Sequence, residues 1–145
     1  MKILDFIICD DVREEVNAKM TLVGTYVDKL VYGYTKKNPI KWPVHARTYF
    51  YVKFCLCEQG EADIITFRFK DGGKNTVHYE QSINLLQEHV SKLDPGLFIV
   101  RYPKIDLFEN STIELELEYF LKGESKGIVQ SGSIYQVESR EAQSS

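Results

Sequence analysis

The stretch that decides the fold reads Thr112-Ile113-Glu114-Leu115-Glu116-Leu117-Glu118-Tyr119-Phe120-Leu121, with apolar residues alternating with glutamates over most of its length. Successive side chains of a strand point to opposite faces. The apolar residues would therefore share one buried face, and the glutamates would point to solvent. A helix would scatter the same apolar residues around its circumference. The stretch predicts an amphipathic β-strand.

Seven further stretches combine β-prone residues with flanking turn signals. They lie at residues 1–11, 20–27, 44–57, 64–70, 76–81, 97–102 and 128–137. The strongest turn signal is Asp71-Gly72-Gly73-Lys74-Asn75, because glycine adopts the positive φ that tight hairpins need. Gly24 suggests a β-bulge in the second stretch. About eight strands without repeated helical segments favour an antiparallel β-sandwich, immunoglobulin-like or C2-like, over a barrel or an α/β fold.

Helical spacing is confined to residues 82–93, where Leu86, Val90 and Leu93 recur at intervals of four and three. We expect at most one short helix there. Two prolines and three lysines within residues 34–43 indicate a long surface loop. The length of 145 residues fits one domain. We assign the sandwich to residues 1–137 and a flexible tail to residues 138–145, which carry no large apolar side chain.

Composition excludes several classes of function. The net charge of -3 gives no broad attraction to phosphate, so nucleic acid is not an expected partner. The apolar start of the chain is interrupted by Asp5 and lacks a small-residue cleavage site, which indicates a strand rather than a signal peptide. No stretch approaches the roughly 18 apolar residues of a membrane-spanning helix. Three cysteines within apolar runs fit a reducing compartment. We therefore expect a cytoplasmic protein without a membrane span.

Two short motifs near the start, Cys9-Asp10-Asp11-Val12-Arg13 and Leu22-Val23-Gly24-Thr25-Tyr26, resemble the opening of a family of small bacterial proteins known as a domain of unknown function. In that family an apolar strand ends in an acidic pair, a branched residue and arginine. The second strand reads leucine, branched residue, glycine, any residue, tyrosine. The close resemblance ends at Tyr26. It implies a bacterial β-sandwich and carries no catalytic residues over to this chain.

Aromatic and basic residues gather around the loop at residues 34–43. Tyr34, Lys36, Lys37 and Trp42 are the candidate partner-binding residues. Aromatic rings beside lysines suit an anionic partner or single-stranded nucleic acid, and tryptophan and tyrosine are common hot spots of protein interfaces. The alternative is that Trp42 folds back over the end of the sandwich while the lysines are simply solvated.

Two groups of side chains are candidate metal ligands. Asp10 and Asp11, with neighbouring glutamates, offer oxygen ligands of the kind that Ca²⁺ takes in C2-type domains. Their alternative is a polar turn in which Arg13 pairs with an acid. Cys55 and Cys57 share a strand face, and a zinc site would need histidines to complete it: His45, His78 and His89. Structural zinc sites usually show a second close pair, which is missing here. We expect no cofactor.

Catalytic motifs are absent: the sequence contains no nucleophile elbow and no phosphate-binding glycine loop. Glu116 and Glu118 share a strand face and mimic a glycosidase dyad, although alternating glutamates are the expected solvent side of such a strand. We expect a non-catalytic module that binds an unidentified protein through the loop residues or a strand edge, where a homodimer can also form. The alternatives are a calcium- or ligand-dependent C2-like domain and an unrecognised hydrolase.

Overall fold

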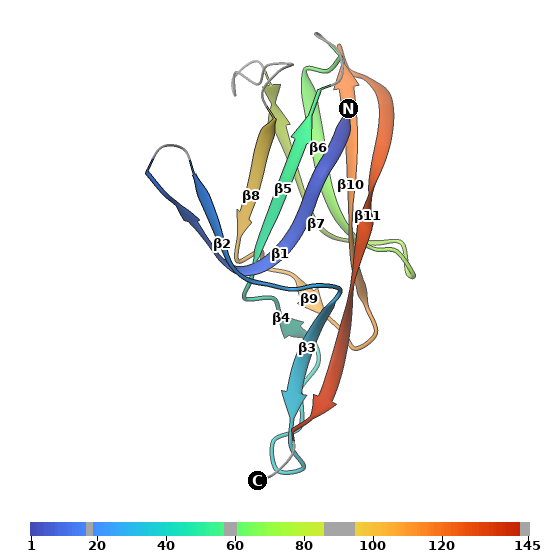
Figure 1. Cartoon of the computed structure of the whole chain (residues 1–145). Helices are drawn as coiled ribbons and strands as arrows, with labels where there is room; N and C mark the ends of the chain where they lie inside the picture. The colour runs from blue at the N-terminus through green and yellow to red at the C-terminus, as the bar shows by residue number, and fades with distance from the viewer. Residues whose placement is uncertain (17–18, 57–60, 86–94, 143–145) are drawn as a thin grey trace.

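The described residues of this chain form eleven strands. The structure, a computed structural model, describes residues 1–16, 19–56, 61–85 and 95–142 (Figure 1). The strands are β1 (Lys2–Glu14), β2 (Met20–Thr25), β3 (Lys29–Tyr34), β4 (Val44–His45), β5 (Tyr49–Cys55), β6 (Ile64–Asp71), β7 (Thr76–Asn84), β8 (Gly96–Arg101), β9 (Asp106–Leu107), β10 (Thr112–Leu121) and β11 (Glu124–Glu141).

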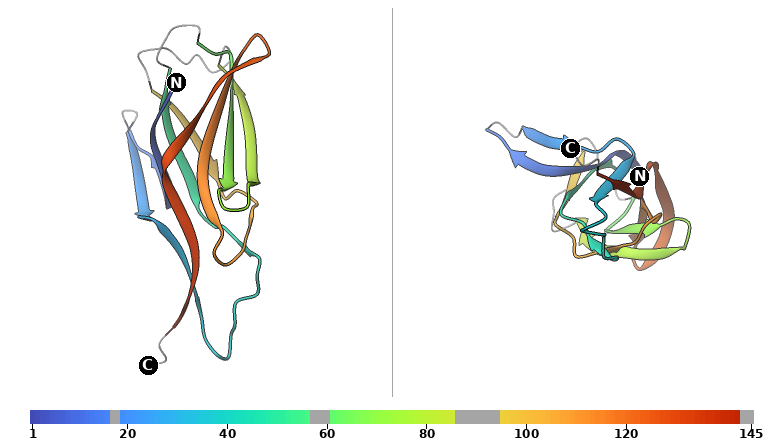
Figure 2. Two further views of the ribbon diagram at one scale, coloured as in Figure 1. Left: turned by 90° about the vertical axis from the view of Figure 1, so that its right-hand side faces the viewer. Right: turned by 90° about the horizontal axis from the view of Figure 1, so that it is seen from below.

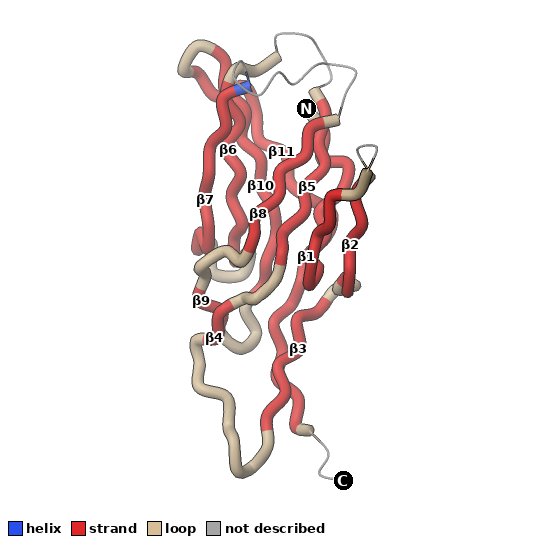
Figure 3. Tube along the Cα trace, turned by 90° about the vertical axis from the view of Figure 1, so that its left-hand side faces the viewer, coloured by secondary structure: helices blue, strands red, loops and turns tan. Residues whose placement is uncertain are grey.

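These strands form two main sheets and one short ribbon (Figure 3). The four-stranded sheet has the order β2-β1-β5-β8, and the five-stranded sheet has the order β3-β11-β10-β6-β7. The ribbon pairs β4 with β9. Neighbouring strands are antiparallel except for β3 and β11, which run parallel. The predicted β class and its antiparallel character are confirmed, with eleven strands in place of about eight.

An aromatic core joins the two sheets. Phe6 of β1 and Phe50 of β5 contact Phe69 of β6, with ring centroids 5.5 and 4.7 Å apart. Phe67 of β6 stacks on Phe98 of β8 at 3.9 Å. Such ring pairs add to the stability gained from burying their area. On β10 the alternating apolar residues Ile113, Leu115 and Leu117 are completely buried against this core, which confirms the strand predicted from their spacing.

Two strands, β3 and β9, were not predicted, and β4 was not predicted as a strand separate from β5. β4 and β9 have two residues each, too few to show a period. The stretch predicted at residues 44–57 is divided between β4 and β5. β3 lies partly inside the predicted loop and is held by its parallel pairing with the end of β11. A local period does not report such a pairing between distant segments.

The predicted tail is wrong for residues 138–141. These residues belong to β11 and pair with residues 31–34 of β3. Main-chain hydrogen bonds do not require large apolar side chains, so the absence of such side chains did not exclude a strand. Residues 143–145 lie outside the described residues.

The hairpin predicted at residues 71–75 is confirmed. The buried Asp71 carboxylate accepts hydrogen bonds from the N–H groups of Gly73 and Lys74 in the turn between β6 and β7. By contrast, β1 and β2 pair without a register shift at Gly24, so the bulge suggested there is wrong. Residues 82–84 of the predicted helix belong to β7, and residues 86–93 lie outside the described residues. The described part of the chain holds no helix long and apolar enough to cross a lipid bilayer.

β1 changes partner along its length. Residues 2–9 pair with β5, whereas residues 9–14 pair with β2. The second half of β1 and β2 therefore leave the body of the protein together as a projecting hairpin, which Figure 1 shows clearly. At the opposite end, β3 and the last residues of β11 extend below the body toward the C-terminus (Figure 1).

Replacing Leu115 by alanine should lower the free energy of unfolding by about 2–5 kcal/mol, because the cavity left in the core adds to the lost burial. Ile128→Ala on the neighbouring strand is the control. That side chain is 54% exposed, so its loss should cost less than about 1 kcal/mol. Urea denaturation of both variants measures the difference, and equal losses would contradict the assignment of the buried face.

Candidate binding groove

Figure 2 (left) shows that β1 and β11 are neighbours on one side of the protein. An open groove is lined by residues of both strands. Its volume is about 410 Å³. Residues 3–7 of β1 form one wall, and residues 131–133 of β11 with Tyr135 form the other. Residues 25–27, at the end of β2, close one end. The groove thus lies between an edge of the four-stranded sheet and an edge of the five-stranded sheet.

The β1 wall is a strand edge. Along residues 2–8, β1 pairs with β5 on one side, with a register shift between Ile3 and Asp5, and no described strand pairs with its other side. The main chain of Ile8 points away from β5, since its N–H donates to the Tyr135 hydroxyl and its C=O accepts from the N–H of Tyr26. Main-chain groups alternate in direction along an antiparallel strand. The N–H of Phe6 therefore also points into the groove.

Tyr135 closes the groove at the end near Ile8, where residues 25–27 also lie. Its side chain is 3% exposed and packs edge-to-face on Phe6 at 5.4 Å. The hydroxyl accepts from the Ile8 N–H and donates to the Phe6 carbonyl, both at 3.2 Å. Burial raises the pKa of this hydroxyl, and the hydrogen bond from Ile8 lowers it in part. One tyrosine on β11 thus holds the edge of β1 and satisfies two of its main-chain groups.

The β11 wall is a bulge. Glu114 pairs with Ile134 and Glu116 pairs with Gln130, so β11 carries extra residues between these two pairs. The Ser131 hydroxyl accepts from the Leu115 N–H at 3.2 Å and donates to the Ser133 carbonyl at 2.9 Å. The Ser131 hydroxyl thus accepts the hydrogen bond that a main-chain carbonyl of β11 would accept in a regular ladder. Bulges of this kind redirect the main chain. The bulged backbone faces the free edge of β1.

The end of the groove is held by Asp10, Gly24 and Tyr26. The Tyr26 hydroxyl donates to the Asp10 carboxylate at 2.6 Å across Gly24. Gly24 has a φ of 66°, and a Cβ at this position would collide with the Asp10 carboxylate. Only glycine meets both conditions without strain. Asp10, Gly24 and Tyr26 belong to the two motifs near the start of the sequence. Together they form one interaction that fixes the chain as it leaves β2.

This interaction is expected to show in the titration of Tyr26. The hydrogen bond to Asp10 raises the pKa of Tyr26 to about 12, with a further contribution from burial. The pKa in the folded state is therefore above that of an unfolded tyrosine, near 10. The stability that it contributes is complete below about pH 10 and is lost as the pH rises toward 12.

Asp10→Asn should lower the pKa of Tyr26 toward 10, because it removes the negative charge beside the hydroxyl. Titration of ¹³C-labelled tyrosine by NMR measures this shift. Asp106→Asn is the control, since Asp106 is exposed and pairs with His45 instead. An unchanged pKa of Tyr26 in Asp10→Asn would contradict the interaction.

Tyr135→Phe should lower the free energy of unfolding by about 1–3 kcal/mol, because it leaves a buried N–H and a buried carbonyl of β1 without their partner. Tyr79→Phe removes a hydroxyl that bonds to Gln81 at the surface and should cost less than about 0.5 kcal/mol. Thermal and urea unfolding compare the two variants. A loss in Tyr135→Phe no larger than in Tyr79→Phe would argue against the role of Tyr135.

The proposed calcium ligands do not converge. Asp10 and Asp11 are adjacent on β1, so their side chains leave opposite faces of the strand. Asp10 is bonded to Tyr26, and Asp11 accepts from the Arg13 Nε at 3.1 Å. Within the described ranges, no three His, Cys, Asp or Glu side chains are grouped in a way that suits a metal ion.

The zinc candidates are dispersed in the same way. His45 lies 3.5 Å from Asp106, and the His78 ring bonds to the Thr112 carbonyl. Cys55 is a free, half-buried thiol. Cys57 and His89 lie outside the described residues.

The loop residues are divided between two surroundings. Trp42 is half-buried, packs against the core and meets the Tyr32 ring edge-to-face at 6.2 Å. Lys36 and Lys37 are exposed on a tight turn where Thr35 and Asn38 exchange main-chain hydrogen bonds. This turn and residues 141–142 border a second hollow of about 420 Å³. Tyr34 is half-buried at the end of β3.

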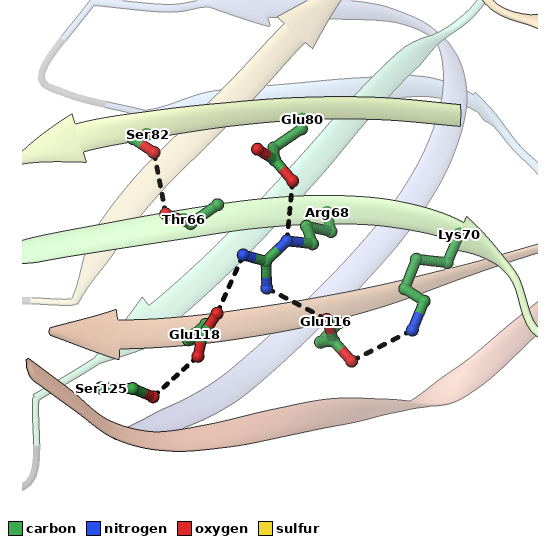
Figure 4. Close-up of polar contacts among 8 residues, drawn as sticks. All are labelled: Thr66, Arg68, Lys70, Glu80, Ser82, Glu116, Glu118 and Ser125. Atoms are coloured by element: carbon green, nitrogen blue, oxygen red, sulfur yellow. Dashed lines mark hydrogen bonds and ion pairs between the residues drawn. The ribbon is translucent and has the colours of Figure 1, made fainter. Parts of the chain in front are cut away.

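Two glutamates of β10, Glu116 and Glu118, belong to an ion-pair network on the outer face of the five-stranded sheet (Figure 4). The Arg68 guanidinium contacts Glu80 at 2.7 Å, Glu118 at 2.9 Å and Glu116 at 3.2 Å. Lys70 also reaches Glu116, at 3.3 Å. Glu116 is only 8% exposed, so the prediction that the glutamates all point to solvent is wrong for this residue. Desolvation would lower the pKa of Arg68, but its hydrogen bonds to the three glutamates raise it overall.

This network does not have the properties of a glycosidase dyad. Hydrogen bonds from Ser125 and from Arg68 lower the pKa of Glu118. A general acid needs a carboxyl whose pKa is raised. Glu116 lies between the Arg68 guanidinium and the Lys70 ammonium and forms an ion pair with each. The arrangement is suited to keeping an outer sheet face polar while satisfying its charges.

Sequence patterns did not predict the residues that line the groove. Gly132 between two serines was the available signal, because glycine inside a strand often marks a bulge or a close approach of backbone. Tyr135 gave no signal of its own. No family model matches this chain, and neither a curated protein nor a solved structure matches it.

Proposed function

We propose that this chain is a non-catalytic module that binds another protein by accepting an extended segment of it in the groove between β1 and β11. The observation that carries this proposal is the free edge of β1 along residues 3–7, which lines a groove of about 410 Å³. An unpaired strand edge presents N–H and C=O groups that a partner strand can bond. Adding a strand to such an edge is a recurring mode of peptide recognition.

The dimensions of the groove suit a short strand. Residues 3–7 of β1 extend over at most about 16 Å at roughly 3.3 Å per residue, because the register shift between Ile3 and Asp5 shortens the strand locally. Each main-chain hydrogen bond formed with a partner contributes about 0.5–1.5 kcal/mol after the loss of water is counted. The exposed side chain of Leu4, at 46%, adds apolar contact area on this wall. These contributions fit a reversible interaction rather than a permanent one.

The groove is favoured over the loop as the binding surface. Trp42 packs on Tyr32 and against the core, so its ring is only partly accessible to a partner, while Lys36 and Lys37 are exposed. The groove instead joins main-chain groups of two sheets in one concave surface.

The proposal includes the remaining expectations from the sequence. We place the fold among antiparallel sandwiches of immunoglobulin-like or C2-like form, on the support of two sheets that share an aromatic core. We place the protein in the bacterial cytoplasm, on the support of its motif resemblance and of the free thiols of Cys9 and Cys55.

Gly132→Trp tests the proposal. Gly132 lines the groove, and a Cβ added there meets no atom within 4 Å, so the new side chain should obstruct the groove without disturbing the core. Gly33→Trp is the matched control, because Gly33 also has free space around an added Cβ and lies on β3. Partners are captured from the protein's own cells with each tagged variant and quantified by mass spectrometry.

The expected result is a partner captured by wild type and by Gly33→Trp, and reduced by about tenfold or more by Gly132→Trp. Hydrogen exchange at residues 3–7 should slow when the purified partner is added. A partner captured equally by all three proteins would overturn the proposal. A second copy of this chain is the competing occupant. A dimer found by sedimentation in wild type and lost in Gly132→Trp would identify that occupant instead.

A further inference from the structure

The free edge of β1 also sets which side chains of a bound segment meet which surface. This inference rests on the proposed function. Phe6 and Ile8 point into the core, so Asp5 and Ile7 point to the opposite, outer face of the sheet. A strand that pairs with β1 places its residues on the same faces as the residues they oppose. A bound segment therefore has one inner and one outer row of side chains.

The inner row has little room. It would lie against the bulge at residues 131–133 and beside the Tyr135 ring, which already fills the end of the groove. Phe6 occupies the core beneath it, at 4% exposure. Large aromatic side chains would collide with these groups, whereas glycine, alanine, serine, threonine or valine would fit. The inner row therefore favours small residues.

The outer row meets one charge and one apolar residue. Asp5 is exposed and carries the one carboxylate among the described residues that line the groove. Lys53 of β5 already occupies the position opposite Asp5 on the paired side. A residue bound on the free side would be the second cross-strand neighbour of Asp5. Opposite charges on neighbouring strands attract, and like charges repel.

We propose that the groove recognises an extended segment that carries a basic side chain beside Asp5, an apolar side chain beside Ile7 and small side chains in its inner row. Main-chain pairing supplies binding that is independent of sequence, and the outer row supplies the choice among segments. Reversing the charge at Asp5 changes an attraction into a repulsion. It should weaken binding of such a segment by about three- to tenfold.

A library of random peptides displayed on phage tests this inference. Wild-type protein, Asp5→Lys and Gly132→Trp are each used as the immobilised target. Asp106→Lys is the control for the same change of charge at an exposed position away from the groove. The peptides selected by wild type are then synthesised, and their affinities for all four proteins are measured by fluorescence anisotropy.

Selected peptides should alternate small with larger residues, contain lysine or arginine in the outer row and bind Gly132→Trp weakly. Asp5→Lys should select aspartate or glutamate at the same place, while Asp106→Lys behaves as wild type. If the peptides bind Gly132→Trp weakly but bind Asp5→Lys as tightly as wild type, this inference is overturned and the proposed function stands. Peptides that bind Gly132→Trp as well as wild type would overturn both. Failure to select any peptide would also count against the inference.

Discussion

The hydroxyl of Tyr135 links the edge of β1 to β11, and the shape of the groove depends on this contact. It accepts from one residue of β1 and donates to another, so the two sheets are joined by hydrogen bonds as well as by their aromatic core. Beyond Tyr135, β1 keeps its pairing with β5 on one side only. The Tyr135 contact thus closes one end of the groove between β1 and β11. The rest of the β1 edge that lines the groove stays unpaired.

Several groups that resemble functional sites have structural roles in the described part of the chain. Asp10 holds Tyr26 across Gly24, and this contact fixes the chain between β2 and β3. Arg68 forms ion pairs with three glutamates on the outer sheet face. In each case the polar groups are hydrogen-bond or ion-pair partners of one another. The free main-chain edge of β1 differs because its partners would come from another molecule.

Local pattern was enough to predict the strands whose signal lies in their own residues. The alternation around Leu115 and the turn at residues 71–75 predicted β10 and the hairpin of β6 and β7. The end of β11 was not predicted, since its parallel partner β3 lies about a hundred residues earlier in the chain and holds it by main-chain bonds. The groove could not be predicted from the sequence for the same reason. Tyr135 acts on residues 127 and 129 positions away, and no local period reports such a contact.

Amide hydrogen exchange along β1 of the free protein, resolved by NMR, tests the account most directly. Ile7 points to β5 and Ile8 donates to Tyr135, so both amides should exchange slowly. The Phe6 amide directly precedes them in the chain but points into the open groove, and it should exchange much faster than the Ile7 amide. If Phe6 is protected as strongly as Ile7, the edge is already covered in the free protein. The open groove, and the binding role argued from it, would then be contradicted.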